Sequence, residues 1–302
     1  MGTTNVIETF PAKRLLLPVR HGDDQFFSAD YNMNLYRGCN HGCIYCDTRS
    51  ECYHIDRFDE IRYKQDCLHM LESELRQKRK TGVIFMGSAS DSYNAAEPAL
   101  CLTQRALILL KRYGFGVGIT TKSDLSARDG DILTEMSKTA PTYLIFSITA
   151  AEDSLSRLLE PGAPVSSRRF AAMQALAKQG VFTGTWICPV VPFVTDHEEN
   201  ILSLIDQTAD AGGRFVMCPL GMTLRTGNRE YFYEALEGLP AFRGVKQQYV
   251  DTFGLQYQCA SPRAEALWPI LVERCQKKGL LYRFAEISAA IRGQCPSQLR
   301  FF

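Results

Sequence analysis

Six short β-rich runs alternate with amphipathic stretches over the first 220 residues, and this alternation limits the possible folds more than any other feature. The predicted strands cover residues 31–38, 82–88, 115–122, 142–149, 181–191 and 214–220. The stretches between them have the apolar spacing of helices, at residues 57–79, 97–113, 126–137, 165–179 and 196–211. Such alternation builds parallel β/α units, whose ligand sites lie at the carboxyl ends of the strands. We therefore predict an α/β fold, a partial (β/α)6 barrel.

The strand pattern stops after about residue 222, and helical patterns follow at residues 228–237, 242–253, 262–279 and 283–293. The chain is too short for eight β/α units plus this tail. We therefore expect an N-terminal extension (1–29), the partial barrel (30–222) and a C-terminal helical extension (223–302).

Charge and hydropathy exclude several classes of protein. The chain has 34 Lys and Arg against 33 Asp and Glu, a net charge of +1, so no global excess points to nucleic acid or membrane. Apolar runs are far shorter than the roughly 18 residues of a spanning helix, and the N-terminus does not resemble a signal peptide. We expect a cytoplasmic location without a membrane partner. Disulfides are rare in that compartment, so we interpret clusters among the eleven cysteines first as metal or redox ligands.

Three of these cysteines, Cys39, Cys43 and Cys46, form a C-x3-C-x2-C motif after the first predicted strand. Thiolates on one Gly-bearing loop can bind a single soft centre, and three ligands leave one coordination position open. The spacing favours a [4Fe-4S] cluster. Two alternatives are a cysteine trio without metal and a zinc site. Three nearby residues are candidates for the fourth zinc ligand: His41, Cys52 and His54.

The motif, with Tyr45 before its third cysteine, resembles the signature of radical S-adenosylmethionine (SAM) enzymes. Five blocks between residues 30 and 220 resemble, in the same order, the strand-end segments of the spore photoproduct lyase-like (DNA repair photolyase-like) family. They are YRGCNHGCIYCD (36–47), MGSASDSYNAAE (86–97), ITTKSD (119–124), SITAAEDSLSRLLEPGAP (147–164) and ICPVVPFVTD (187–196).

The resemblance implies a radical SAM enzyme with a partial barrel and two cofactors. Cys39, Cys43 and Cys46 would hold a [4Fe-4S] cluster whose open iron binds the amino and carboxylate groups of S-adenosylmethionine. Reductive cleavage would then give a 5′-deoxyadenosyl radical that abstracts hydrogen from the substrate. It also implies an electron donor such as flavodoxin or ferredoxin.

Six residues at or near predicted strand ends are candidates for binding S-adenosylmethionine: Tyr45, Ser88, Ser90, Lys122, Ser147 and Glu160. Lys122 can donate to a carboxylate or ribose oxygen. Serines after a strand can instead cap a helix or form a turn. Glu160 could hold a ribose or pair with Arg169.

One departure from the family concerns the hydrogen donor to the product radical. Spore photoproduct lyases carry a cysteine at the second strand end, where this chain has Ser88-Ala89-Ser90. A serine O–H bond is too strong for that role, so the catalytic residue stays unknown. Three cysteines could substitute for it or simply be buried: Cys101, Cys188 and Cys218.

The tail, residues 243–302, carries nine Lys and Arg against four acids (9 − 4 = +5), interleaved with aromatic residues. This composition suits phosphate contact with base stacking, although the aromatics could instead pack on the barrel.

The last five residues, Gln298–Phe302, resemble the peptide by which bacterial DNA repair and replication proteins bind the sliding clamp. An apolar tail packed on the barrel is the alternative.

These features favour a radical SAM enzyme acting on nucleic acid, at a DNA lesion or a modified base. One alternative keeps the radical chemistry but acts on a peptide, a tRNA or a small metabolite. The other is a non-catalytic metal-binding adaptor recruited to DNA through its tail.

Overall fold

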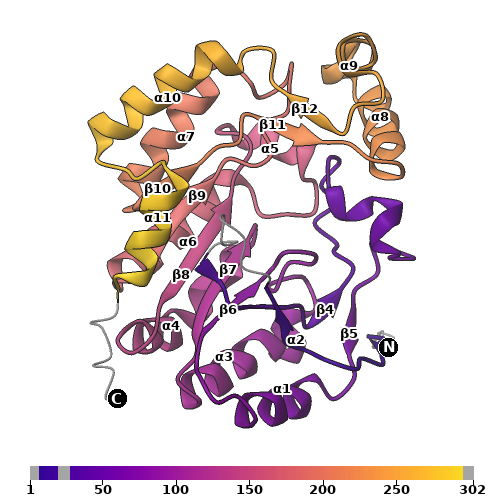
Figure 1. The fold of residues 1–302 in the computed structure, drawn as a ribbon. Helices are drawn as coiled ribbons and strands as arrows, with labels where there is room; N and C mark the ends of the chain where they lie inside the picture. The colour runs from indigo at the N-terminus through magenta and orange to yellow at the C-terminus, as the bar shows by residue number, and fades with distance from the viewer. Residues whose placement is uncertain (1–6, 20–27, 295–302) are drawn as a thin grey trace, which may run out of the picture.

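Six parallel strands form the centre of the molecule (Figure 1). The structure, a computed structural model, describes residues 7–19 and 28–294. From one edge of the sheet to the other the parallel strands are β10 (Phe215–Met217), β9 (Phe182–Trp186), β8 (Thr142–Ser147), β7 (Gly116–Thr121), β6 (Val83–Met86) and β3 (Tyr31–Met33). A short antiparallel strand, β2 (Leu17–Pro18), pairs with β3 at the edge. The predicted α/β partial barrel is confirmed.

Helices cover the outer face of this sheet. They are α1 (Cys67–Arg76), α2 (Glu97–Leu100), α3 (Leu102–Arg112), α4 (Gly130–Ser137), α5 (Asp153–Leu159), α6 (Ser166–Lys178) and α7 (Glu198–Asp210). Every residue of β6, β7 and β8 is buried. Burial on both faces is typical of parallel strands and explains their uninterrupted apolar sequences.

The inner face of the sheet is packed partly by the C-terminal region. Ile287 and Ile291 of α11 (Phe284–Arg292) join a cluster with Tyr143 and Phe215. Gly118 makes room for the Tyr143 ring, because a Cβ there would lie 2.2 Å from it. The last described helix is therefore part of the barrel core.

Two sequence predictions near the N-terminus are wrong in extent. The helix expected over 57–79 is α1 alone, and Arg62–Lys64 form a strand, β5, that pairs with β1 (Thr9–Phe10) and β4 (Tyr36–Arg37). The strand expected over 31–38 accordingly splits into β3 and β4. Local periodicity cannot reveal this three-stranded sheet, because its partners are distant in sequence.

The C-terminal region contains the four predicted helices: α8 (Asn228–Gly238), α9 (Val245–Phe253), α10 (Ala264–Lys278) and α11. The prediction that strands stop after residue 222 is wrong, since β12 (Gln258–Ala260) pairs antiparallel with β11 (Gly221–Thr223). The division at residues 29 and 222 stays a prediction. Within residues 7–19 and 28–294, none of the helices has the length and apolar character needed to cross a membrane.

Candidate functional site

The cysteine motif lies on the loop that follows β4, and neighbouring segments hold it by backbone contacts. Gly38 has φ +82°, and a Cβ there would lie 2.3 Å from the Glu60 carbonyl oxygen, so only glycine fits. The Cys39 N–H donates to the Phe58 carbonyl at 2.8 Å. On the far side of the loop, the Gly162 N–H donates to the His41 carbonyl at 2.8 Å.

Cys43 is buried, Cys39 and Cys46 are half-buried, and the thiols influence one another. Burial raises the pKa of Cys39 to about 12, and the negative charge of Asp91 adds to this shift. Burial also raises the pKa of Cys43, against the opposing effect of Lys122, while Cys46 and Cys39 contribute to the rise. Metal binds the thiolate, so loading this site must release protons from the thiols.

The donor set consists of three thiols, the donors that hold iron–sulfur clusters in proteins. Among the described residues, no three or more His, Cys, Asp and Glu side chains stand around one point as ligands of one ion would. Each thiolate of a four-iron cluster binds a different iron, so its sulfurs surround a larger body. Of the proposed fourth zinc ligands, Cys52 is exposed and accepts from Arg225 Nη1 at 3.2 Å, while His41 Nε2 lies 3.0 Å from Asp91 Oδ2.

Asp91 connects the cysteine loop to the ends of β6 and β7. Its buried carboxylate accepts from the Tyr93 N–H at 2.8 Å, the Thr121 hydroxyl at 2.8 Å and the Lys122 N–H at 2.7 Å. Burial acts to raise the pKa of Asp91, but His41 and these donors outweigh it and hold the pKa at about 2. The carboxylate is therefore a structural anion that fixes the loop to the sheet edge.

Ser90 has a similar structural contact. Its buried hydroxyl donates to the Gly38 carbonyl, directly before the first cysteine of the motif. Ser88 is exposed, donates to Asn32 Oδ1 at 3.1 Å and accepts from Asn34 Nδ2 at 3.4 Å. Ser90 therefore shapes the loop, while Ser88 lies at the surface.

A buried polar chain runs beneath the motif through Tyr45 and Glu160. The Tyr45 hydroxyl donates to Glu160 Oε1 and lies 3.0 Å from Thr149 Oγ1. Arg169 Nη2 donates to Glu160 Oε2, and both side chains are at most 1% exposed. Of the two roles considered for Glu160, pairing with Arg169 is the one the geometry shows.

Lys122 and Ser147 lie at the ends of β7 and β8, on the same side of the sheet. The Lys122 Nζ lies 5.6 Å from the centre of the Tyr45 ring. Burial acts to lower the pKa of Lys122, but the negative charges of Cys43 and Glu160 outweigh it and raise the pKa. Ser147 Oγ donates to the Cys188 carbonyl at 3.3 Å. Among the sequence candidates, Lys122 thus has a cationic head directed at the motif.

The structure brings most sequence candidates together and adds residues that the pattern missed. The cysteine loop, Tyr45, Lys122 and Glu160 are linked through the contacts above. Ser147 joins them because Arg169 Nη1 donates to its carbonyl at 2.9 Å, and Ser88 stands at the exposed margin. Thr149 and the His41–Asp91 contact were not anticipated in these roles. The sequence signal for this contact is the position of His41 inside the cysteine motif.

The cysteines considered as hydrogen donors differ in their surroundings. Cys188 follows β9, and burial raises its pKa to about 12 while the charge of Lys122 acts to lower it. Burial likewise raises the pKa of Cys218 to about 12. Cys101 is half-buried at a helix junction, where its thiol lies 3.7 Å from the Pro98 carbonyl. Cys188 is therefore the candidate whose pKa is affected by the positive charge of Lys122.

Two of the six described aromatic residues of the tail belong to the core, whereas Tyr257, Trp268 and Phe284 are exposed. Tyr249 and Phe253 are buried in a cluster that also contains Cys43 and Tyr45. Several tail cations pair with acids, as in the contact of Arg274 with Asp206 at 3.2 Å. The packing interpretation therefore holds for Tyr249 and Phe253. The positive charge of the tail is partly neutralised by these ion pairs.

Comparison with known proteins identifies the family. The model of the Radical SAM superfamily matches residues 33–205. An uncharacterized protein of Mycobacterium tuberculosis is 30% identical over 211 residues, 67% of this chain and 61% of the relative. An uncharacterized protein of Methanocaldococcus jannaschii is 30% identical over 172 residues, 56% of this chain and 64% of the relative. The chain spans about three fifths of the length of these relatives.

Solved structures share the fold at low sequence identity. Spore photoproduct lyase complexed with dinucleoside spore photoproduct superposes with a TM-score of 0.62 and 15% identity, over 84% of this chain and 76% of that one. The radical SAM methyltransferase TsrM from Kitasatospora setae gives a TM-score of 0.55 and 12% identity, over 87% and 60%. Together with the superfamily match, these similarities show that the chain belongs to the radical SAM superfamily, whose enzymes use a [4Fe-4S] cluster and S-adenosylmethionine.

Proposed function

We propose that Cys39, Cys43 and Cys46 hold a [4Fe-4S] cluster and that S-adenosylmethionine binds beside it, next to Lys122. The observation that carries this proposal is the trio of buried and half-buried thiols, fixed to the carboxyl edge of the parallel sheet with the Lys122 cation directed at it. When bound, the two cofactors supply a 5′-deoxyadenosyl radical by reductive cleavage. The protein binds and orients them and excludes water from the thiols.

The surrounding residues divide into binding and positioning groups. Lys122 would pair with the carboxylate of S-adenosylmethionine, and Ser147 and the Tyr45 ring would lie against the rest of the molecule. Glu160 is occupied by Arg169 and Tyr45, so it acts as a positioning residue for the loop.

The two serines after β6 also have different roles, one in positioning the loop and one in binding. Ser90 is occupied by a loop carbonyl and acts by positioning the first cysteine. Ser88 would contact the methionine end from the exposed margin.

Anaerobic reconstitution with iron and sulfide tests the cofactor proposal. Wild-type protein should become brown and, with dithionite, cleave S-adenosylmethionine to methionine and 5′-deoxyadenosine. Alanine at Cys39, Cys43 and Cys46 should abolish both, whereas alanine at the exposed Cys52 should abolish neither. Stoichiometric zinc without iron or sulfide, in protein purified anaerobically from iron-replete cells, would contradict the proposal.

The proposed substrate is nucleic acid, at a damaged or modified base. Two observations support it: the tail excess of +5, and the fold shared with a lyase solved in complex with a dinucleoside photoproduct. A peptide, tRNA or small metabolite is the alternative. Incubation with deuterated candidate substrates separates these classes, because only the true substrate transfers deuterium into 5′-deoxyadenosine.

The proposed partners are a sliding clamp and an electron donor such as flavodoxin or ferredoxin, in the cytoplasm. The clamp peptide, Gln298–Phe302, lies outside the described residues. Deleting it should abolish clamp binding while S-adenosylmethionine cleavage and DNA affinity stay unchanged. Clamp binding that survives the deletion would refute this assignment.

A further inference from the structure

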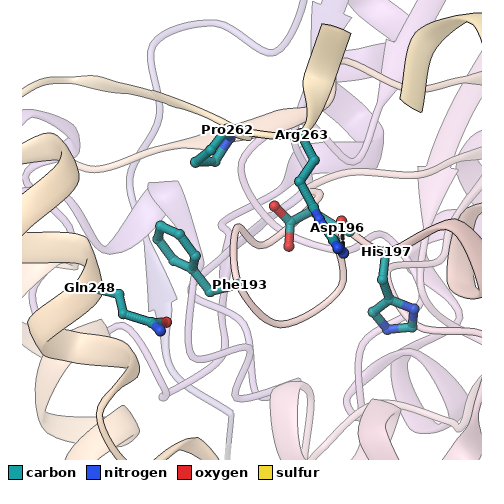
Figure 2. A pocket seen from close by; sticks show the side chains of 6 residues that line it. All are labelled: Phe193, Asp196, His197, Gln248, Pro262 and Arg263. Atoms are coloured by element: carbon teal, nitrogen blue, oxygen red, sulfur yellow. Dashed lines mark hydrogen bonds between the residues drawn. The ribbon is translucent and has the colours of Figure 1, made fainter. Parts of the chain in front are cut away.

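A pocket of about 330 Å³ lies outside the candidate site, between the loop after β9 and the C-terminal region (Figure 2). Three segments supply its walls: the β9–α7 loop, helix α9 and the turn between β12 and α10. Its lining consists of Phe193, Asp196, His197, Gln248, Pro262 and Arg263. The proposed cofactor chemistry uses none of them.

The pocket contains a buried acid with an unused acceptor. Asp196 is 3% exposed, and its Oδ2 accepts from Ser261 Oγ at 2.6 Å. None of the described residues donates to its Oδ1. Figure 2 shows the carboxylate turned toward the side where Phe193 and Pro262 lie. Oδ1 is therefore open to the pocket, where a ligand N–H could donate to it in place of water.

The other walls favour a flat ligand that carries an anion. Phe193 is held by an edge contact with Tyr249 at 5.6 Å between ring centroids and presents an apolar ring to the pocket. Arg263 is exposed at the rim, where its Nη1 donates to the Asp196 carbonyl at 3.5 Å. A rim guanidinium attracts phosphate and repels a cationic peptide side chain.

We propose that this pocket binds a nucleotide whose base carries an exocyclic amino group. The amino group would donate to Asp196, as cytosine N4 does to carboxylates in base recognition. The base would lie against Phe193, and the phosphate would face Arg263. The nucleotide is either a free monomer or an unpaired base of a single strand, and the latter case rests on the nucleic-acid substrate proposed above.

Calorimetric titration of the full-length, cluster-loaded protein with 5′-CMP and 5′-UMP tests the pocket. The two ligands share ribose and phosphate. Cytosine has an exocyclic amino group at position 4 and an acceptor at N3, whereas uracil has a carbonyl at position 4 and only the ring N3–H as a donor. We expect 5′-CMP to bind roughly tenfold more tightly, the effect of one hydrogen bond to a charged acceptor. Tighter binding of a short oligodeoxycytidine than of 5′-CMP assigns the ligand to a strand, and the reverse assigns it to a monomer.

Two variants make the test specific. Asp196→Asn keeps an oxygen for Ser261 and replaces an acceptor with a donor, so it should abolish or reverse the preference for 5′-CMP. Arg263→Ala should weaken both nucleotides equally. Arg79→Ala, at an exposed arginine outside both this pocket and the tail, is the matched control and should change neither.

The inference is overturned if 5′-CMP and 5′-UMP bind equally, or if Asp196→Asn leaves the preference unchanged. Tighter binding of N-acetylarginine amide than of 5′-CMP would also overturn it, in favour of a peptide ligand. Cleavage of S-adenosylmethionine without nucleotide is measured in parallel. It reports on the cofactor proposal alone, so failure of one proposal is distinguished from failure of the other.

Discussion

The substitution Glu160→Gln tests whether the buried ion pair beneath the cysteine motif stabilises the fold. Glu160 and Arg169 are 1% and 0% exposed. Glutamine keeps the shape of the Glu160 side chain but leaves the Arg169 cation without a charged partner. Breaking a buried ion pair in this way lowers the free energy of unfolding by about 3–5 kcal/mol. Arg169 also donates to the carbonyls of Pro164 at 2.7 Å and Ser147 at 2.9 Å. Because these two hydrogen bonds remain in the variant, we expect a loss at the lower end of this range, about 3 kcal/mol.

Equilibrium unfolding in urea at pH 7, followed by circular dichroism, measures this loss. Glu135→Gln is the control, since its pair with Lys138 is 50% and 61% exposed and should contribute less than about 1 kcal/mol. The double variant Glu160→Gln/Arg169→Met should lose less than the sum of the single losses, because it removes the stranded cation. The reasoning is refuted if Glu160→Gln costs no more than Glu135→Gln.

The pH dependence of the same variant has a defined sign. Burial acts to raise the pKa of Glu160, but Arg169 and Lys122 outweigh it and hold the pKa below its ordinary value of 4.5. The stabilisation is therefore fully present above pH 4.5 and is lost as the pH falls through the folded-state pKa. The stability difference between wild type and Glu160→Gln should shrink below pH 4.5. A difference that grows toward acid pH would contradict this assignment.

Three further predictions concern single side chains. Lys122→Ala should weaken S-adenosylmethionine binding by about ten- to a hundredfold in equilibrium dialysis, with iron content unchanged, whereas Lys138→Ala should change neither. An unchanged isotherm would show that Lys122 does not bind S-adenosylmethionine. Ser90→Ala should cost about 1–3 kcal/mol in urea unfolding, because a buried loop carbonyl loses its donor. Iodoacetamide at pH 8 should alkylate the exposed Cys52 within minutes and leave Cys188, with its pKa of about 12, largely unmodified by mass spectrometry.

The amino-acid sequence by itself determined the β/α alternation, the C-x3-C-x2-C motif and the four C-terminal helices. Each of these depends on spacing within a short window, where periodicity and ligand geometry act. The same locality explains the errors. Arg62–Lys64 and Gln258–Ala260 become strands only because distant segments, β1 and β11, pair with them.

Only the tertiary structure decided which polar groups near the motif are already occupied. Glu160 and Ser90 both carry oxygen atoms suited to a cofactor, and in the structure Arg169 donates to Glu160 while the Ser90 hydroxyl donates to the Gly38 carbonyl. Asp196 has no distinguishing feature in the sequence, but the loop after β9 and the turn before α10 enclose it in a pocket with a free acceptor oxygen. Burial and pairing depend on which remote segments meet, and local sequence does not encode that directly.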